Sequence, residues 1–436
     1  MKTARSKMRK PFGIVDIGAT KLACLIAETL PEGQIQHLGQ AVHAADGIKN
    51  GEISDLRAFS TALGKAVESA EKNAGIEIKT IHIVSSFGSP ALSHHHHTIQ
   101  LGDQAISKKD VGRLRHRYQP LDEDEHRTIL QTIEHDFTLD NHISVETPIG
   151  MFARHLGIRY AHLSMQRASW MNMVSAAHIN HLEIGEYHHA ASMAGLSCLN
   201  EDMRQAGTLV LDFGGAATSL AIYDKGYLQH ASTVKMGGNH ITRDIAKILG
   251  LSLSEAERVK ALDGSALPSL AAIPIQNAAH FPMKGDNFVQ ASLTQPLPAQ
   301  PQTAISAEQY QLLPCIIISR LDEIMELVEQ RLRTDNIGAL NQYHLAVTGG
   351  GSQLTGLSDY LGEKYKKSIF MRPPEGMNGL EGQISGGSFA AALGMTDFIT
   401  RPWDTHPDVI QTASPHTDKG RFRLPGKLGR WLETHL

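Results

Sequence analysis

The chain has 436 residues, of which 41% are hydrophobic and 20% are charged. This length exceeds a single ordinary core, so we expect two or more domains of a soluble globular protein. The formal net charge of -4 provides no overall basic field and argues against a nucleic-acid partner. No apolar run approaches the ~20 residues that a membrane-spanning helix needs, so any contact with a membrane is expected at its surface.

The three cysteines, Cys24, Cys198 and Cys315, stand far apart in the sequence. Because none has the close spacing of a zinc-binding pair, we expect all three to be reduced and buried in a cytoplasmic protein. The basic N-terminus is not followed by the uninterrupted apolar run of a signal peptide, since Asp16 and several glycine or polar positions break it.

The first predicted elements form a strand–turn–strand unit. Strands are expected at 12–17 and 22–26, on either side of an Asp-Ile-Gly-Ala-Thr turn, and a third is expected near 34–43. Apolar residues at helical spacing predict a helix over 56–73, and a short apolar run predicts a buried strand over 81–86.

Residues 88–168 differ in composition, since they are rich in histidine and other polar residues. We interpret them as a small inserted α+β subdomain, with a helix from Lys108 and strand-like pieces at 98–101, 136–139, 142–145 and 160–165. Four consecutive histidines, His94–His97, are interpreted as a solvated strand or loop of this subdomain. A chance metal site is the alternative, but neighbouring residues in a strand point to opposite faces.

The strand–turn–strand unit recurs in the second half of the chain. Helical signals over 171–194 lead to a buried strand at 208–213, a Gly-Gly turn and a strand at 219–223. Asp212 then occupies the place that Asp16 has in the first unit. The recurrence predicts two related halves.

The remainder of the chain alternates helices with two irregular stretches. A Pro-, Ala- and Gln-rich stretch over 264–305 and a polar stretch over 402–420 are predicted to be irregular. Helices are expected at 241–249, 254–262, 315–332, 354–365 and 386–395, and a strand at 343–347 leads into Thr-Gly-Gly-Gly-Ser at 348–352.

Two of the turns have the composition of phosphate-binding loops, because glycine permits positive φ and a close approach of backbone N–H groups to a phosphate. The second turn offers Asp212, Gly214 and Gly215, and the two aspartates together suit Mg²⁺ held through water. Each turn taken alone is better explained as an ordinary tight hairpin. The candidates in the first turn are Asp16, Gly18, Ala19, Thr20 and Lys21, whose ammonium is placed to reach a terminal phosphate.

A third loop, Thr348–Ser352, joins a strand to a helix. Gly349, Gly350 and Ser352 suit an adenosine lying flat against the backbone, although a plain strand-to-helix loop has the same composition. The chain contains neither a Walker A sequence nor the dinucleotide-binding fingerprint. Three such loops in this order are more specific than any one of them, and they indicate a nucleotide-binding protein.

The three loops resemble the motifs of the actin-like ATPase superfamily and, within it, of the FtsA family of bacterial cell division proteins. Asp16–Lys21 is similar to the phosphate-1 pattern Asp-Ile-Gly-Thr-Thr-Lys, Val210–Thr218 to phosphate-2 and Leu345–Ser352 to the adenosine motif. The resemblance covers roughly residues 12–395. It implies an α/β, actin/Hsp70-type (ribonuclease H-like) two-lobed ATPase fold, with an inserted FtsA-type 1C subdomain and a C-terminal amphipathic helix.

Two further segments carry the resemblance. Gly237–Ala246 is similar to the FtsA segment that follows phosphate-2, which implies nucleotide contacts for Gly238 and Asn239. A later segment, Ser-Glu-Ala-Glu-Arg-Val-Lys, is similar to the helix that holds ribose and adenine in that family, which assigns those contacts to Glu257 and Lys260. Their i, i+3 spacing places both on one helix face, and a surface salt bridge is the alternative.

One departure from the family pattern concerns hydrolysis. The phosphate-2 loop usually reads Asp-Ile-Gly-Gly-Gly-Thr, and here Ala216 and Ala217 replace the third glycine and the threonine. A methyl group at 216 restricts φ, and the missing hydroxyl removes a phosphate or water contact. We therefore expect slow or absent ATPase activity. No catalytic base is assigned, because Glu201, near the catalytic position of relatives, is interpreted as a solvated helix-end carboxylate.

The resemblance also implies the domain organisation. Subdomain 1C, SHS2-like, would mediate self-association and contacts to later division proteins, and its closing strands resemble Pro148–Met151 and Leu156–Leu163. The implied bounds are 11–87 and 169–207 for 1A, 88–168 for 1C, 208–250 and 335–398 for 2A, 251–334 for 2B, 399–420 for a flexible linker and 421–436 for the terminal helix.

The last residues resemble the FtsA membrane-targeting sequence. Apolar residues recur at helical spacing beside basic ones, as in a helix that lies in the interface of an anionic membrane. A C-terminal helix docked on its own domain is the alternative. The candidate membrane-binding residues are Leu424, Lys427, Leu428, Arg430, Trp431 and Leu432.

The resemblance implies a cell division protein that binds ATP with Mg²⁺, polymerises in an actin-like manner and lies on the cytoplasmic face of the bacterial inner membrane. At the division site it would tether FtsZ filaments, with the FtsZ C-terminal peptide docked on subdomain 2B. The alternatives are a pilus-assembly protein of the PilM type, which would generally lack the amphipathic tail, and a sugar kinase or polyphosphate phosphatase, for which we find no catalytic carboxylate motif.

Overall fold

The structure, a computed structural model, describes residues 11–30, 35–49, 51–117, 125–267, 305–371 and 389–400. These residues form two compact units. One contains the described residues up to Pro90 and from Ser169 onward, and the other spans Ala91–Ala168. The stretches predicted to be irregular, the linker and the amphipathic tail lie wholly or mostly outside the described residues.

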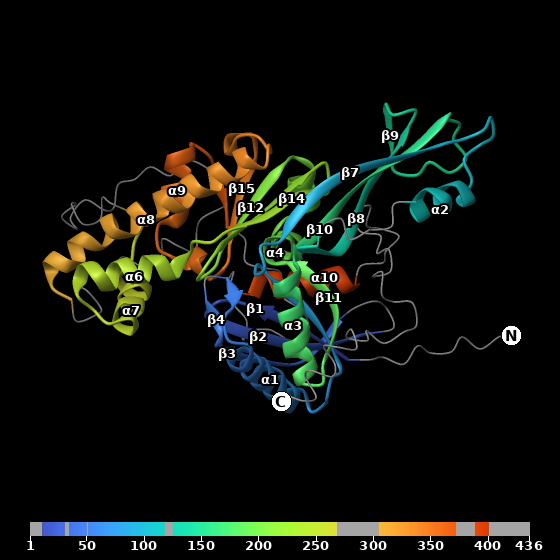
Figure 1. Cartoon of the computed structure of the whole chain (residues 1–436). Helices are drawn as coiled ribbons and strands as arrows, with labels where there is room; N and C mark the ends of the chain where they lie inside the picture. Colours follow the sequence, from blue (N-terminus) through green and yellow to red (C-terminus); the bar gives the residue numbers. More distant parts are fainter. Residues whose placement is uncertain are drawn as a thin grey trace. The chain divides into compact units, whose positions relative to one another are not determined.

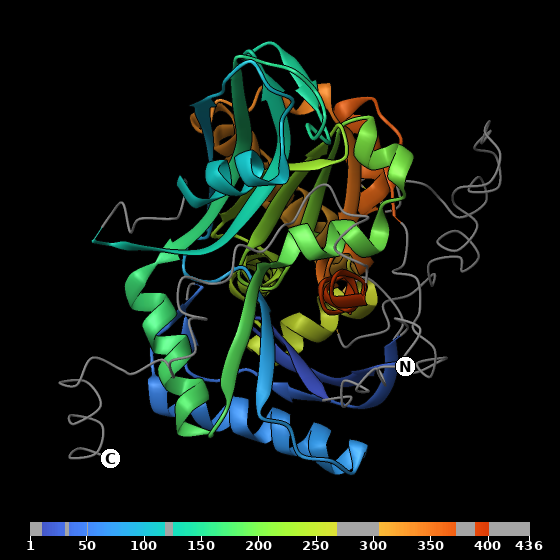
Figure 2. The same cartoon turned by 90° about the vertical axis from the view of Figure 1, so that its right-hand side faces the viewer.

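The first unit contains two five-stranded sheets of the same design (Figures 1 and 2). In the first sheet, β1 pairs antiparallel with β2 and parallel with β6. Helix α1 (Leu56–Ala74) packs against β2 and β3 and buries its apolar stripe there. The strand order is β11-β6-β1-β2-β3, with β1 at Phe12–Ile17, β2 at Lys21–Thr29, β3 at Ile35–Ala44, β6 at Thr80–Ser85 and β11 at Glu183–His189.

The second sheet repeats this arrangement. Strand β12 pairs antiparallel with β13 and parallel with β15, as β1 does with β2 and β6. The recurrence predicted from the sequence is therefore confirmed as two sheets that each begin with a hairpin. The order is β14-β13-β12-β15-β16, with β12 at Thr208–Phe213, β13 at Thr218–Asp224, β14 at Tyr227–Val234, β15 at His344–Thr348 and β16 at Ile369–Phe370.

Two helices connect the sheets of this unit. Helix α4 (Ala190–Cys198) packs on strands of the second sheet, and α10 (Ala390–Thr400) packs on α4 and on β1. The two cross so closely that a Cβ added at Gly394 would lie 1.7 Å from the carbonyl oxygen of Met193. Glycine at 394 is thus required by the crossing.

The remaining elements of the first unit flank the sheets. Helix α8 is the longest, and its apolar side forms a core with the second sheet, α6 and α7. These elements are β4 Ile48–Lys49, β5 Glu52–Ile53, α3 Arg167–Ile179, α5 Glu201–Gln205, α6 Gly238–Leu249, α7 Leu253–Asp263, α8 Ala307–Thr334, η3 Leu340–Gln342, η4 Gly350–Gln353 and α9 Leu357–Tyr365.

The second unit is one four-stranded antiparallel sheet with a helix, α2 (Lys108–Arg117), on one face. Val111 and Leu114 of α2 join a small apolar core under the sheet. The order is β7-β10-β8-β9, with β7 at Ala91–Gln100, β8 at Arg127–Leu139, β9 at Ile143–Val145 and β10 at His155–Gln166.

The structure departs from the sequence predictions at several points. The helical segment predicted over 171–194 is interrupted by β11, and Pro148–Met151 forms a turn rather than a closing strand. Three strands of the second unit, β7, β8 and β10, are longer than the predicted pieces. Buried polar residues, such as Thr132, Glu134 and Asp136 in β8, interrupt the apolar alternation there. Cys24 and Cys198 are buried as expected, but Cys315 is exposed on α8, so that expectation was wrong.

His94–His97 lie within β7 and pair with β10, which confirms a strand. His94 and His96 are exposed, and His95 and His97 are half-buried. His95 contacts the ring of Tyr160 and, at 4.8 Å between ring centroids, the ring of His162. No group of three or more metal-ligating side chains suitable for a metal ion is found in the described part of the chain.

His162 makes the second unit sensitive to acid. Burial, with a smaller contribution from neighbouring His95, lowers the pKa of this histidine from 6.5 to about 4. Because the unfolded chain binds a proton that the native chain does not, the free energy of unfolding should decrease as pH falls from about 6.5 to about 4, by up to about 1.4 kcal/mol per pH unit. His162→Gln removes the titration but keeps a side chain able to hydrogen-bond with Thr132.

The check is hydrogen exchange of β8 and β10 amides in urea at about pH 6.5 and about pH 5, corrected for intrinsic exchange. The His162→Gln variant should lose less stability between the two pH values than the wild type does. His142→Gln, at an exposed position, serves as the control. An identical loss in the wild type and in His162→Gln would contradict the expectation.

Candidate functional site

The two hairpin turns have the same geometry. The N–H of Gly18 donates to the carbonyl of Lys21, and the N–H of Gly214 donates to the carbonyl of Ala217, each at 3.0 Å. A Cβ on either glycine would lie 2.9 Å from that same carbonyl oxygen. Neither glycine has positive φ, so both are required by the close approach within the turn.

The alanines of the second turn fit it without strain. Neither Ala216 nor Ala217 has positive φ. The methyl group of Ala216, which was expected to restrict φ, therefore does not strain this turn. The threonine that follows, Thr218, is buried in β13 and donates to the carbonyl of Met236 at 2.8 Å, so its hydroxyl is directed away from the turn.

The last residues before the turns bring two carboxyls into one electrostatic environment. Burial raises the pKa of Asp16 to about 6, which Lys21 partly offsets. Burial, with a further contribution from Asp16, raises the pKa of Asp212 to about 7. Burial lowers the pKa of Lys21, against the attraction of both carboxylates. The pKa values of Lys21 and Asp212 respond to both other groups and that of Asp16 responds to Lys21, so these three side chains share one site.

The loop after β15 closes on the same carboxyl. Gly349 has φ of 88°, and a Cβ there would lie 2.2 Å from Oδ1 of Asp212. The hydroxyl of Ser352 is buried and donates to the carbonyl of Gly349 at 2.7 Å. Ser352 therefore holds the loop closed on itself, while Gly350 begins the short helix η4. The third predicted loop thus lies against the second.

Helix α6 begins on the second turn. The N–H groups of Gly238 and Asn239 donate to the carbonyls of Gly214 and Gly215, at 2.9 and 2.7 Å. A Cβ on Gly215 would lie 2.9 Å from Cγ2 of Thr20 and 3.0 Å from Oδ1 of Asn239. Residues from both turns and from the helix start are therefore neighbours.

Glu257 and Lys260 of α7 join the site through Thr242. The ammonium of Lys260 donates to Oγ1 of Thr242 at 2.9 Å, to Glu257 at 2.8 Å and to the carbonyl of Gly238 at 3.3 Å. Burial alone would raise the pKa of Glu257, but hydrogen bonds from Lys260 and Thr242 hold it below its usual range. The pair is therefore tied to the start of α6 rather than being an isolated surface salt bridge.

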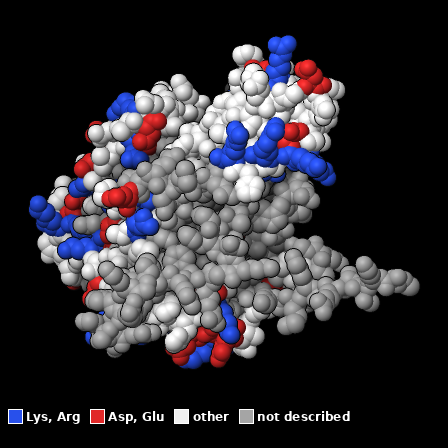
Figure 3. Space-filling view, turned by 45° about the vertical axis from the view of Figure 1, so that its right-hand side comes forward, with Lys and Arg blue, Asp and Glu red and all other residues white. Residues whose placement is uncertain are grey.

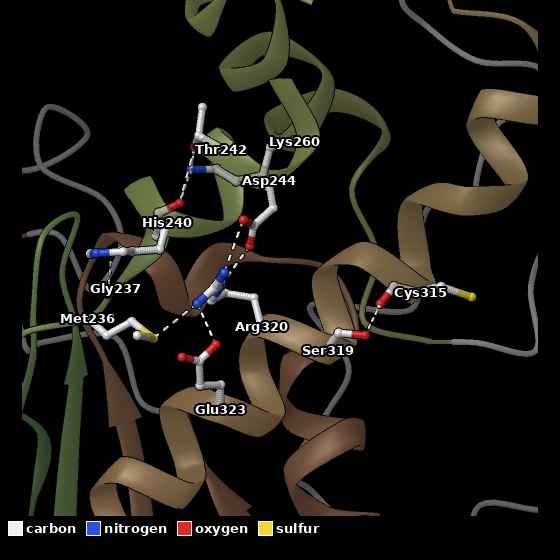
Figure 4. A network of polar contacts seen from close by, with 11 residues as sticks. Met236, Gly237, His240, Thr242, Asp244, Lys260, Cys315, Ser319, Arg320 and Glu323 are labelled. Atoms are coloured by element: carbon white, nitrogen blue, oxygen red, sulfur yellow. Dashed lines mark hydrogen bonds and ion pairs between the residues drawn. The ribbon is translucent and has the colours of Figure 1, made fainter. Parts of the chain in front are cut away.

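A second network fastens α6 to α8 (Figure 4). The guanidinium of Arg320 donates to both oxygens of Asp244, at 2.6 and 3.0 Å, and also to Glu323. The same guanidinium contacts the sulfur of Met236 at 3.6 Å. Just beyond, Nδ1 of His240 accepts from the N–H of Gly237 at 3.2 Å. The segment Met236–Asp244, whose first residues bond to the second turn, is thus held by α8.

The sequence analysis missed Thr242 and Arg320 as parts of this assembly. Thr242 lies one helical turn after Gly238, a local signal that would have found it. Arg320 and Asp244 are 76 positions apart, and no local pattern links them. Glu201 accepts from Arg204 and Gln205 on α5, and Gln205 lies by Gly226 at the opposite end of the β12–β13 hairpin from the turn. Glu201 is therefore not placed at the candidate site.

Gly349 offers a direct test of this geometry. Gly349→Ala combines an unfavourable backbone conformation, which costs about 1–3 kcal/mol, with a clash against Asp212. Gly250→Ala is a control for positive φ without a clash, because Gly250 has φ of 69° in the left-handed helical region and open space around its Cα. Thermal unfolding should show a larger loss of stability for Gly349→Ala. Equal losses in the two variants would show that the loop does not close on Asp212.

Comparison with known proteins identifies relatives along the whole chain. A family model described as "Cell division protein FtsA" matches residues 209–394, and a model described as "SHS2 domain inserted in FTSA" matches residues 88–164. The cell division protein FtsA of Rhizobium meliloti (strain 1021) is 28% identical over 451 residues, which cover 99% of this chain and 96% of the relative. The FtsA of Escherichia coli (strain K12) is 24% identical over 396 residues, which cover 88% and 89%.

Among solved structures, the PilM-PilN type IV pilus biogenesis complex is similar, with a TM-score of 0.55 and 16% identity over 91% of this chain and 100% of that chain. This likeness concerns the fold alone and agrees with the actin/Hsp70-type α/β architecture. The two FtsA models match successive parts of the sequence, and the Rhizobium meliloti FtsA aligns along nearly its full length. The chain belongs to the FtsA family and is a bacterial cell division protein.

Proposed function

We propose that the candidate site binds ATP with Mg²⁺. The observation that carries the proposal is the meeting of two matched turns, which brings Asp16, Asp212 and Lys21 into one environment. The backbone N–H groups of the turns and the ammonium of Lys21 suit the phosphates, and the two carboxylates suit Mg²⁺ held through water. Glu257 and Lys260 would hold the ribose and adenine, with Gly349 and Gly350 against the base.

We expect hydrolysis to be slow or absent. Phosphoryl transfer to water needs a group that positions the water, and Ala217 replaces the hydroxyl that the family pattern provides. Glu201 lies at the wrong end of the hairpin for that task. The protein would then use ATP mainly as a bound ligand that sets its conformation.

The two carboxyls give nucleotide binding a defined pH dependence. Their raised pKa values mean that Mg²⁺ must displace protons between about pH 6 and about pH 7, so affinity for Mg·ATP should rise across that range and level off above it. Asp212→Asn should abolish the Mg²⁺-dependent part of the affinity. Without ligand it should raise the melting temperature at about pH 8, because a buried charge is removed.

Fluorescent ATP titrations with and without Mg²⁺, beside thermal unfolding, measure both effects. Lys247→Ala, at an exposed position in the last turn of α6, is the control and should match the wild type. If Asp212→Asn binds Mg·ATP as the wild type does, the site lies elsewhere.

We further propose that the protein polymerises, lies on the inner membrane through its C-terminal helix and tethers FtsZ filaments there. Family membership supports these roles, and the apolar and basic residues of the tail support the membrane contact. In the described part of the chain, no helix is long and apolar enough to span a membrane. The FtsZ C-terminal peptide would dock on subdomain 2B, to which α8 belongs.

Co-sedimentation with anionic vesicles tests the tether. The full chain should pellet and carry FtsZ with it, whereas a truncation after Asp418 should remain in solution and leave FtsZ there. A truncated chain that still binds FtsZ in solution would separate the two roles. A full chain that fails to pellet, with or without ATP, would overturn the anchor.

A further inference from the structure

Helix α2 of the second unit presents a basic face. Val111 and Leu114 are buried toward the sheet, which leaves the opposite side of the helix in solvent. Lysine and arginine side chains gather over this helix in the space-filling view (Figure 3). Ten residues include one acid, Asp110, and five bases: Lys108, Lys109, Arg113, Arg115 and Arg117.

Two of these bases are used within the unit, and three are not. Arg115 pairs with Glu134 at 2.7 Å, and Arg113 pairs with Asp110 at 3.2 Å. Lys108, Lys109 and Arg117 are exposed, and none of them has an ion pair with any residue that the structure describes. Their charge is therefore available to an external partner.

Exposed apolar side chains stand beside the start of this helix. Ile149, Met151 and Phe152 are 45%, 40% and 72% exposed. Their loop is bonded to Ile106, whose N–H donates to Met151 and whose carbonyl accepts from Gly150, both at 2.8 Å. Ile106 is two positions before Lys108, so the apolar loop and the first turn of α2 are neighbours.

We propose that this α2–Phe152 surface, formed by Lys108, Lys109, Arg117, Ile149, Met151 and Phe152, docks on an anionic lipid bilayer. Protruding apolar side chains suit the interface between headgroups and acyl chains, and adjacent bases are attracted to anionic headgroups. The inference rests on the proposed function, in which the tail holds the chain at the membrane. A single short amphipathic helix binds only marginally, so a second contact would raise the residence of each molecule.

The arrangement of the positive charges favours an anionic lipid surface over an acidic protein as the partner. The three available bases are distributed over the length of α2 rather than converging on one point, which matches a surface of uniform negative charge. The acidic run at 122–125, which follows α2 in the sequence, would oppose the contact. The charge reversals below measure the net effect.

The first experiment compares vesicle binding at about 0.1 M salt, using vesicles with phosphatidylglycerol and vesicles of phosphatidylcholine alone. Lys108→Glu with Lys109→Glu should weaken binding of the full chain to the anionic vesicles at least about tenfold, since each base near such a surface contributes about fivefold. Arg57→Glu with Lys72→Glu makes the same charge change on exposed positions of α1 and should not alter binding. Equal weakening of binding in the two double variants, or no weakening in either, would overturn the proposal.

The second experiment reports on the surface itself. An environment-sensitive dye is attached to the thiol that Phe152→Cys introduces. The variant also carries Cys315→Ser, because Cys315 is exposed and would react, whereas Cys24 and Cys198 are buried. Burial also raises the pKa of Cys24 to about 12, which keeps that thiol unreactive. A blue shift on anionic vesicles is expected. No shift while the full chain pellets through its tail would refute docking yet leave the anchor intact, and a shift without lipid that grows with protein concentration would assign the surface to a second copy.

Discussion

The site depends on holding two half-buried carboxyls in one electrostatic environment. Asp16 and Asp212 are the next-to-last residues of β1 and β12. Burial raises the pKa of both carboxyls, and Asp16 raises the pKa of Asp212 further. Lys21 lowers the pKa of both carboxyls and so partly offsets the cost of ionisation, although burial disfavours its own charge. Without ligand, such a pair of carboxyls lowers the free energy of unfolding, and the binding of a cation should raise it.

Packing elsewhere in the first unit resists the separation that this repulsion would favour. Lys235 of the segment after β14 pairs with Glu52 at 3.2 Å, and Ser86 bonds to Ser219 across the two sheets. Helices α4 and α10 cross at van der Waals limits, at Gly394. Because packed backbones cannot slide past one another gradually, the two sheets are set in a defined relation into which a ligand can fit.

The second turn is continuous with α8 through α6. Gly214 and Gly215 accept from the first N–H groups of α6, and Asp244, two turns along, is held by Arg320 of α8. A charged, bidentate pair of this kind has a narrow range of geometries. Any rotation of α6 at its N-terminus must therefore move α8 or break the pair. This connects the candidate site mechanically to α8, which lies in the subdomain proposed to meet FtsZ.

How far the sequence could predict this structure depends on the range of each interaction. The hairpins were predictable because strand, turn and strand are adjacent, and because the pattern occurs twice. Strand β11 was missed, since its residues between two helices carry no alternation, and Arg320 was missed because its partner is distant. Glu257 and Lys260 came from family resemblance rather than from spacing, and only the structure shows why the pair is held, through Thr242.

The backbone and the side chains have different roles in these turns, which explains why the sequence of the second turn can depart from the family pattern. In the proposed site, the turns would bind phosphate through backbone N–H groups. Glycine is needed at Gly18 and Gly214, where a Cβ would meet a carbonyl, and at Gly215, where it would meet Thr20 and Asn239, whereas Ala216 and Ala217 stand in the second turn without positive φ. If the proposed site holds ATP, a change at Ala216 or Ala217 should affect hydrolysis more than affinity. Gly349, by contrast, must stay glycine because its neighbour is the oxygen of Asp212 itself. In the proposed function, binding and hydrolysis would therefore depend on different residues, so that a chain could keep nucleotide binding while losing hydrolysis.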